Sequence, residues 1–196
     1  RYTNNHRNSD AKLLYGYGYA DAATGLGNAA WPGIYTSPYD QNLFDGQASG
    51  PLKLFGREHQ LSLGVSHATM HGREYSQSTL AFPAYASVSD WAVRGIYPAE
   101  GGYGPQVLSE DSRDRLTRVY GAVHVNFADR LKGVFGASAM WLRSSGFNYG
   151  VDQTRRNAAL SPYAGLVFDA TRNISFYASY TDIYNPQKEV DINNVR

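Results

Sequence analysis

Cysteine is absent from the 196 residues of this chain, which excludes disulfide frameworks, thiolate metal sites and catalytic thiols. An excess of charge of either sign is also lacking. The chain has 18 Lys and Arg against 17 Asp and Glu, so the net charge of +1 offers no basis for nucleic-acid binding. Charged residues make up 18% of the chain, compared with about 25% in ordinary soluble domains. The surface is therefore unusually poor in charge.

Long apolar runs are missing as well. No stretch of about 18 or more apolar residues occurs, which excludes a membrane-spanning helix. Membrane-spanning strands need only about 9 to 11 residues, and their alternating pattern keeps the mean hydropathy low. The composition therefore remains compatible with a membrane protein built of strands.

Three segments alternate apolar and polar residues with the period of two that is typical of strands with one apolar face. The most regular is residues 160 to 180, where "DATRN" supplies Asp and Asn for a turn. The other two are residues 119 to 141, turned at "ADR", and residues 52 to 65, turned at "GREH". The pattern predicts three antiparallel hairpins. The apolar face of the first would carry Leu160, Pro162, Ala164, Leu166, Phe168, Ile174, Phe176, Ala178 and Tyr180, with Tyr180 and Tyr184 near an outer membrane interface.

Long connections separate these tight hairpins. One runs from Ala68 to Leu116 and includes "SEDSRDR" (109 to 115), interpreted as a solvated loop foot; a second runs from Arg143 to Ala158. "NAAWPGIYTSPYDQN" (28 to 42) is also predicted to be loop, because Pro and Gly interrupt strand pairing. Alternation of short turns with long loops is typical of outer-membrane barrels. It disfavours a β-sandwich, which has turns at regular short intervals.

Motifs for catalysis or metal binding are weak. "GLGNAA" (25 to 30) matches a loose dinucleotide fingerprint, but Trp31 and Pro32 follow where a helix is required. His67 and His71 have a spacing that brings two imidazoles together on a helix but not on a strand. No G-x-S-x-G motif occurs. The sequence predicts neither an enzyme nor a protein-bound metal.

Aromatic residues make up 14% of the chain, and 16 of them are tyrosines. Those in the long loops have two interpretations. They can pack the loops or mark a membrane interface, or they can form a platform that buries an organic ligand while an arginine meets its charge. For the group we favour ligand contact. The candidate binding residues are Trp31, Tyr35, Tyr39, Tyr85, Trp91, Arg94, Tyr97 and Tyr103.

Three segments resemble consecutive barrel segments of TonB-dependent siderophore receptors, with the ferripyoverdine and coprogen (hydroxamate) receptors as the most similar branch. They are "LFGREHQLSLGVSH" (54 to 67), "RVYGAVHVNFADRLKGVFGASAMWLRS" (118 to 144) and "SPYAGLVFDATRNISFYASYTDIYNPQ" (161 to 187). The last is the most specific, because its turn, its aromatic spacing and the trailing Asn185, Pro186 and Gln187 fall where the family has them.

The resemblance implies an all-β fold, an antiparallel transmembrane β-barrel with short periplasmic turns and long extracellular loops. Residues 1 to 196 would supply about six to eight strands of a barrel of about 22, with the plug domain and the remaining strands outside this sequence. The resemblance further implies location in the bacterial outer membrane, contact with outer-membrane lipid and import of a ferric siderophore. Energy would come from the TonB–ExbB–ExbD complex through an N-terminal region that this sequence lacks.

Two alternatives remain open at this point. One is a small complete outer-membrane barrel, either an adhesin or a lipid-modifying enzyme, which would need an aromatic closing strand that residues 185 to 196 do not supply. The other is a soluble carbohydrate-binding β-domain, in which tyrosine- and tryptophan-rich loops are also common.

Overall fold

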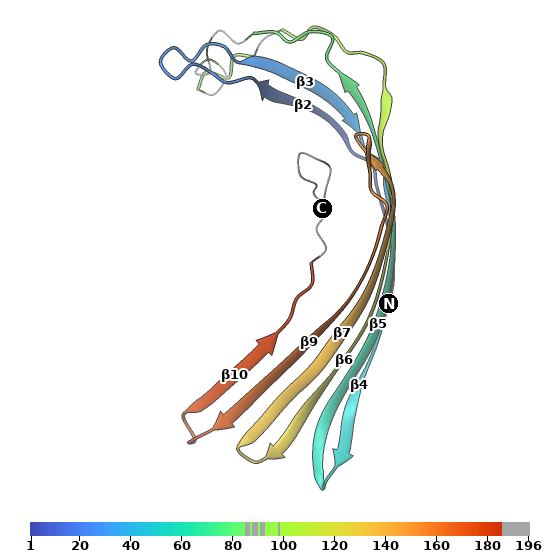
Figure 1. Cartoon of the computed structure of the whole chain (residues 1–196), viewed down its shortest axis with the longest axis vertical. Helices are drawn as coiled ribbons and strands as arrows, with labels where there is room; N and C mark the ends of the chain where they lie inside the picture. Colours follow the sequence, from blue (N-terminus) through green and yellow to red (C-terminus); the bar gives the residue numbers. More distant parts are fainter. Residues whose placement is uncertain (85–86, 88–89, 91–92, 98, 186–196) are drawn as a thin grey trace.

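The computed structural model describes residues 1–84, 87, 90, 93–97 and 99–185. Their strands form one antiparallel sheet in the order β1-β4-β5-β6-β7-β9-β10 (Figure 1). Outside this order, β2 pairs with β3, β3 also pairs with β5, and β8 pairs with β7. Within these residues no helix has the length and apolar composition needed to cross a membrane. The strands are β1 (Tyr2–Arg7), β2 (Asp10–Tyr17), β3 (Ala29–Thr36), β4 (Tyr39–Leu54), β5 (Arg57–Ser78), β6 (Val107–Ala128), β7 (Leu131–Asn148), β8 (Val151–Asp152), β9 (Arg155–Asp169) and β10 (Ser175–Thr181).

β1 and β2 are two halves of one long strand, and so are β3 and β4. The register of β1 on β4 continues unchanged into β2 on β3. Ser9 and Ser37 bridge the break by donating backbone hydrogen bonds to each other's carbonyls, at 3.3 and 2.8 Å. Counted in this way, the described residues contain seven long strands and the two-residue β8. This number lies within the predicted range.

The prediction of a loop at 28 to 42 is wrong, because β3 and the start of β4 occupy this segment. Pro32 is tolerated for a geometric reason. The amide of Ala30 donates to Pro83 O, away from β2, and Pro32, two residues on, presents its nitrogen to the same side. The proline therefore removes no β2–β3 hydrogen bond. The connections are also shorter than predicted, since β5 extends to Ser78 and β6 starts at Val107.

All three predicted hairpins are confirmed, and their tight turns gather at the lower end of Figure 1. Phe55 and Gly56 connect β4 to β5 with φ angles of 53° and 74°, which suits the twist of a two-residue hairpin. Asp129 and Arg130 connect β6 to β7. The β2–β3 tip and the described residues of the connection between β5 and β6 lie at the opposite end.

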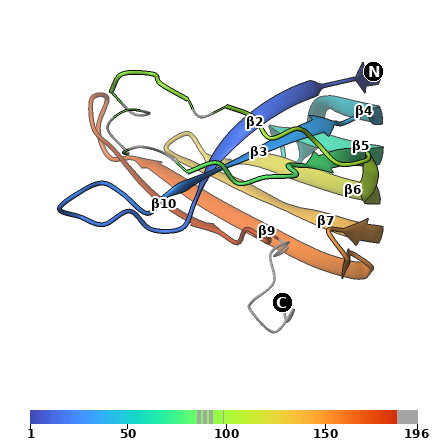
Figure 2. The ribbon, with the colours of Figure 1, turned by 90° about the horizontal axis from the view of Figure 1, so that it is seen from above.

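Pairing in register divides the curved sheet into a convex face, called the outer face, and a concave face, called the inner face (Figure 1). On the outer face, apolar residues continue across the strands from the tight turns upward, as Leu63, Gly121, Ala137 and Pro162 do in one row. The inner face carries mainly Ser, Gly, Tyr and other polar residues, with an apolar area at Leu116, Met140 and Leu142. Figure 2 shows the strands side by side in a single layer. The buried hydrophobic residues in the described part of the chain are few, namely Ala30, Met140 and Leu142. The apolar side chains of the outer face are therefore not covered by other described parts of this chain.

Tyrosines on the inner face lie over glycines of the neighbouring strand. Tyr120 covers Gly64, its direct partner across β5 and β6, and Tyr163 covers Gly136 across β7 and β9. A Cβ at Gly136 would stand 2.5 Å from the carbonyl oxygen of Gly121 and 2.5 Å from the ring of Tyr163. Ring-over-glycine packing of this kind helps to fix the register.

The substitution Gly136→Ala should therefore destabilise the sheet by about 1 to 3 kcal/mol, because the backbone of Gly121 cannot move aside. Gly50→Ala is the matched control, since a Cβ there meets no atom within 4 Å. Thermal unfolding of the purified protein in detergent, followed by circular dichroism, compares the two. Equal midpoints would show that the tyrosine–glycine packing does not hold the register.

Candidate functional site

The predicted ligand residues are distributed over several places in the structure. Tyr85 and Trp91 fall outside the described residues. Tyr97 is 60% exposed in the connection between β5 and β6. In the same connection Arg94 forms an ion pair at 3.0 Å with Asp90, four residues earlier in the sequence. For Arg94 the structure therefore gives a local partner, and its predicted role toward a ligand charge stays a prediction.

Trp31 belongs to an aromatic cluster at the loop end of the sheet. Its ring meets Tyr17 edge to face, with centroids 5.8 Å apart, and lies 6.1 Å from the ring of Phe82. Phe82 comes from the long connection, so the cluster attaches that connection to β2 and β3. Trp31 remains 42% exposed, which leaves part of its ring available. Loop packing is the role that the contacts show.

Glu100 and Tyr103 attach the same connection to β2, because both contact Lys12. Lys12 Nζ lies 2.6 Å from Glu100 Oε2, and the hydroxyl of Tyr103 donates to the same oxygen at 3.0 Å. The hydrogen bond with Lys12 holds the pKa of Glu100 below its usual value, and the bond with Glu100 raises the pKa of Lys12. Tyr103 thus serves as a loop anchor in this structure.

Tyr35 and Tyr149 form a second aromatic and acidic group, on the inner face. Tyr35 meets Tyr15 edge to face, with centroids 6.5 Å apart. Tyr149, just after β7, donates its hydroxyl proton to Glu74 of β5. Burial raises the pKa of the Tyr149 phenol, and the bond with Glu74 adds to the effect. Burial likewise raises the pKa of Tyr35. Both phenols are therefore neutral hydrogen-bonding groups at physiological pH.

Tyr39 lies beside a hollow of the inner wall that is described in the next paragraph. Its hydroxyl donates to the Met70 sulfur, and the guanidinium of Arg7 stands 5.3 Å from its ring centroid. Met70 lines the adjacent hollow. Tyr39 is thus placed to contribute a flat aromatic surface beside that hollow.

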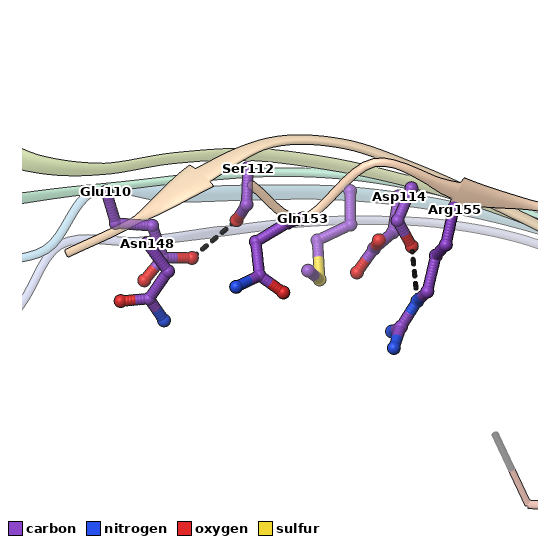
Figure 3. Close-up of a pocket in the computed structure, with 8 residues that line it drawn as sticks. Glu110, Ser112, Asp114, Asn148, Gln153 and Arg155 are labelled. Carbon is purple, nitrogen blue, oxygen red and sulfur yellow. Dashed lines mark hydrogen bonds between the residues drawn. The ribbon is translucent and has the colours of Figure 1, made fainter. Parts of the chain in front are cut away.

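The hollow is a polar pocket of about 150 Å³ on the inner face, near the end that carries the long connections. Side chains from β6, β7, β9 and the β8 turn project into it in the same direction (Figure 3). Ser112 Oγ donates to Glu110 Oε1 at 2.5 Å, and Arg155 Nε donates to Ser144 Oγ at 3.2 Å. The lining residues are Met70, Glu110, Ser112, Asp114, Ser144, Asn148, Gln153 and Arg155.

A more apolar hollow of about 300 Å³ continues from this pocket along the inner wall, and Met70 and Asp114 line both. Leu116, Met140 and Leu142 supply its apolar surface. Tyr184 lies here as well and accepts a hydrogen bond from Asn157 Nδ2 at 3.0 Å. The prediction that Tyr184 marks the outer interface is therefore wrong. β10 ends at Thr181, and Tyr184 and Asn185, just after it, line the hollow on the inner side.

Sequence reasoning missed the acidic part of this wall, because it interpreted residues 109 to 115 as a loop foot. The segment is part of β6, with Glu110, Ser112 and Asp114 on the inner face and Arg113 and Arg115 on the outer face. Alternation of acids with arginines is the signal that would have placed it on a strand. Within the described residues, no three His, Asp or Glu side chains converge as a metal site.

The comparisons with known proteins agree with this architecture. The family described as "TonB dependent receptor-like, beta-barrel" matches residues 1–194. The ferric-pyoverdine 358 receptor of Pseudomonas putida is 30% identical over 169 residues, which are 82% of this chain and 20% of that protein. The ferripyoverdine receptor of Pseudomonas aeruginosa is 30% identical over 78% of this chain and 18% of its own length.

Solved structures show the same arrangement of strands. The pyoverdine outer-membrane receptor FpvA from Pseudomonas aeruginosa, bound to pyoverdine, superimposes with a TM-score of 0.78 at 26% identity, covering 99% of this chain and 28% of that one. FpvA in complex with pyocin S2 gives a TM-score of 0.77 with similar coverage.

The chain spans about a fifth of the length of the curated relatives. The family consists of receptors and transporters of the outer membrane, not of enzymes. The family match therefore excludes the alternative of a soluble carbohydrate-binding β-domain. On the family match across nearly its whole length, this chain belongs to the β-barrel domain of the TonB-dependent receptors.

Proposed function

We propose that this chain forms part of the wall of a larger barrel that binds a ferric siderophore on its inner face and imports it across the outer membrane. The observation that carries the proposal is the polar pocket on the inner face of β6, β7 and β9, in a sheet whose outer face is apolar between this level and the tight turns. Tight turns mark the periplasmic end in outer-membrane barrels. The pocket, at the opposite end, is open to a ligand that arrives from outside the cell.

The chemistry of the pocket suits the organic exterior of a chelate. The iron is cargo that the siderophore has already coordinated, so the wall has to recognise amide, hydroxyl and charged groups. Asn148 and Gln153 offer paired donors and acceptors, and Ser144 fixes Arg155 through its Nε atom. Tyr39 and the apolar hollow below would cover flat or aliphatic parts of the ligand. Trp31, Tyr35 and Tyr103 would organise the loops above it.

The ligand class follows from the relatives. The two curated relatives described above are named as receptors for ferric pyoverdine, and FpvA is solved with pyoverdine bound. A hydroxamate siderophore of the pyoverdine type is therefore our first choice of ligand. Import through a plugged barrel needs energy, which we assign to the TonB–ExbB–ExbD complex acting on the remainder of the receptor.

Uptake of radioactive iron by cells that express the receptor containing this segment tests the proposal. Ferric pyoverdine-type chelates should bind at the surface and enter cells with an intact TonB complex. In cells without TonB, binding should persist and uptake should cease, because binding needs no energy. Uptake that is equal in both strains would contradict the TonB assignment, and failure to bind any hydroxamate chelate would exclude the ligand class.

Two neighbouring arginines provide a sharper test. Arg155 and Arg156 are adjacent on β9, but Arg155 projects into the pocket and Arg156 lies exposed on the outer face. Arg155→Gln should weaken binding of a ferric chelate by about ten-fold, the scale of one charge-assisted hydrogen bond. Arg156→Gln should leave it within about two-fold, as for an exposed surface charge.

Quenching of intrinsic fluorescence by the ferric chelate, in the purified receptor, measures both affinities. An equal loss in the two variants would indicate a general effect of charge, and no loss in either would remove the inner pocket from the binding site.

A further inference from the structure

Three arginines lie side by side on the outer face of the sheet. Arg115 of β6 stands directly opposite Arg143 of β7, and Arg143 stands opposite Arg156 of β9. All three side chains are exposed. Directly opposed residues on neighbouring strands have Cβ atoms about 4.5 to 5.5 Å apart, and like charges in such pairs are destabilising. An anion bound between these arginines would offset their repulsion.

The residues that the structure describes do not place an anion beside these arginines. Among the described residues, none of the three arginines makes an ion pair. Asp111, two rows further along the outer face of β6, already contacts His71 at 3.1 Å and Arg113 at 3.8 Å. The other acids of this part of β6, Glu110 and Asp114, point to the inner face.

The position of the row relative to the membrane indicates the source of the anion. Leu131 begins β7 at the tight turn and Trp141 lies ten residues on, about 33 Å along the strand. With a tilt of about 40°, this distance spans about 25 Å across the membrane, the height of the apolar band of an outer-membrane barrel. Trp141 therefore lies at the outer interface, where its ring is favoured. Arg143 is one step above it, at the level of lipid headgroups.

The arginines also border a hollow. His67, Thr117 and Trp141 form the floor of a depression of about 350 Å³ on this face, and Arg115 and Arg143 line it above. The ring of His67 is held by a hydrogen bond between Nδ1 and Thr117 Oγ1 at 2.9 Å. The hollow thus combines the Trp141 ring and the hydrogen-bonded His67 and Thr117 on the membrane side with two guanidinium groups on the aqueous side.

We propose that Arg115, Arg143 and Arg156 bind the phosphate groups of an anionic lipid of the outer leaflet, with its acyl chains lying on the apolar face below. Guanidinium groups recognise phosphate with paired, charge-assisted hydrogen bonds. The chemistry fits a phosphorylated glycolipid such as lipid A, whose headgroup carries phosphates at the membrane surface. This site lies on the opposite face from the proposed siderophore pocket and does not depend on it.

Titration of the purified receptor in neutral detergent with fluorescent diphosphoryl lipid A tests the proposal. The double variant Arg115→Gln/Arg143→Gln should weaken binding by about ten-fold or more, because both guanidiniums that line the hollow are lost. The matched control is Arg130→Gln/Arg172→Gln, which removes the same charge from the tight turns at the other end of the sheet. It should stay within about two-fold of the unmodified receptor.

Two further measurements separate the outcomes. Inorganic phosphate should not displace lipid A at comparable concentration; if it does, the site binds a free anion and the lipid assignment fails. On the unmodified receptor, where no variant has to fold, lipid A binding should weaken steeply as salt is raised. Equal affinity of the two double variants, or binding that is insensitive to salt, would overturn the proposal.

Discussion

Continuous backbone pairing from β1 to β10 is the constraint on which the rest of the structure depends. Peptide groups in lipid have no water to bond, so each strand must pair along its whole membrane-spanning length. Unbroken pairing fixes the register, and the register assigns every residue to lipid or lumen, because a slip of one position exchanges the faces. The rings of Tyr120 and Tyr163 over Gly64 and Gly136 reinforce this register from inside.

The same pairing lets one short segment serve two environments. On β6, Glu110 and Asp114 point to the pocket, while Arg113 and Arg115 point outward. Glu110 and Asp114 are thereby separated from the two arginines across the thickness of one strand, while Asp111 stays on the outer face, where it contacts His71 and Arg113. In the two proposals made above, these inner acids face water and the chelate, and the outer arginines face the lipid headgroups. The strand thus extends beyond the bilayer without exposing a carboxylate to lipid.

The sequence predicted the hairpins because alternation is a local signal, and it held for Leu160 to Tyr180 nearly residue by residue. The strand ends were not predictable in the same way. Beyond the membrane both faces of a strand can be polar, so the alternation of hydropathy disappears. In "SEDSRDR" only a pattern of charge remains to indicate a strand. The partners of the aromatic residues were not predictable either, because, as for Trp31 with Phe82, they come from distant segments.

The edges of the sheet connect the fold to the proposed function. β1 and β10 each pair on one side only within the described residues, and in lipid such an edge requires a neighbour. A larger barrel supplies one, and its closure would set the far wall of the siderophore pocket opposite Arg155 and Tyr39. The pocket seen here, with a volume of about 150 Å³, is below the usual range for a ligand site. We infer that a whole chelate is enclosed only when strands and loops beyond β1 and β10 complete the cavity around it.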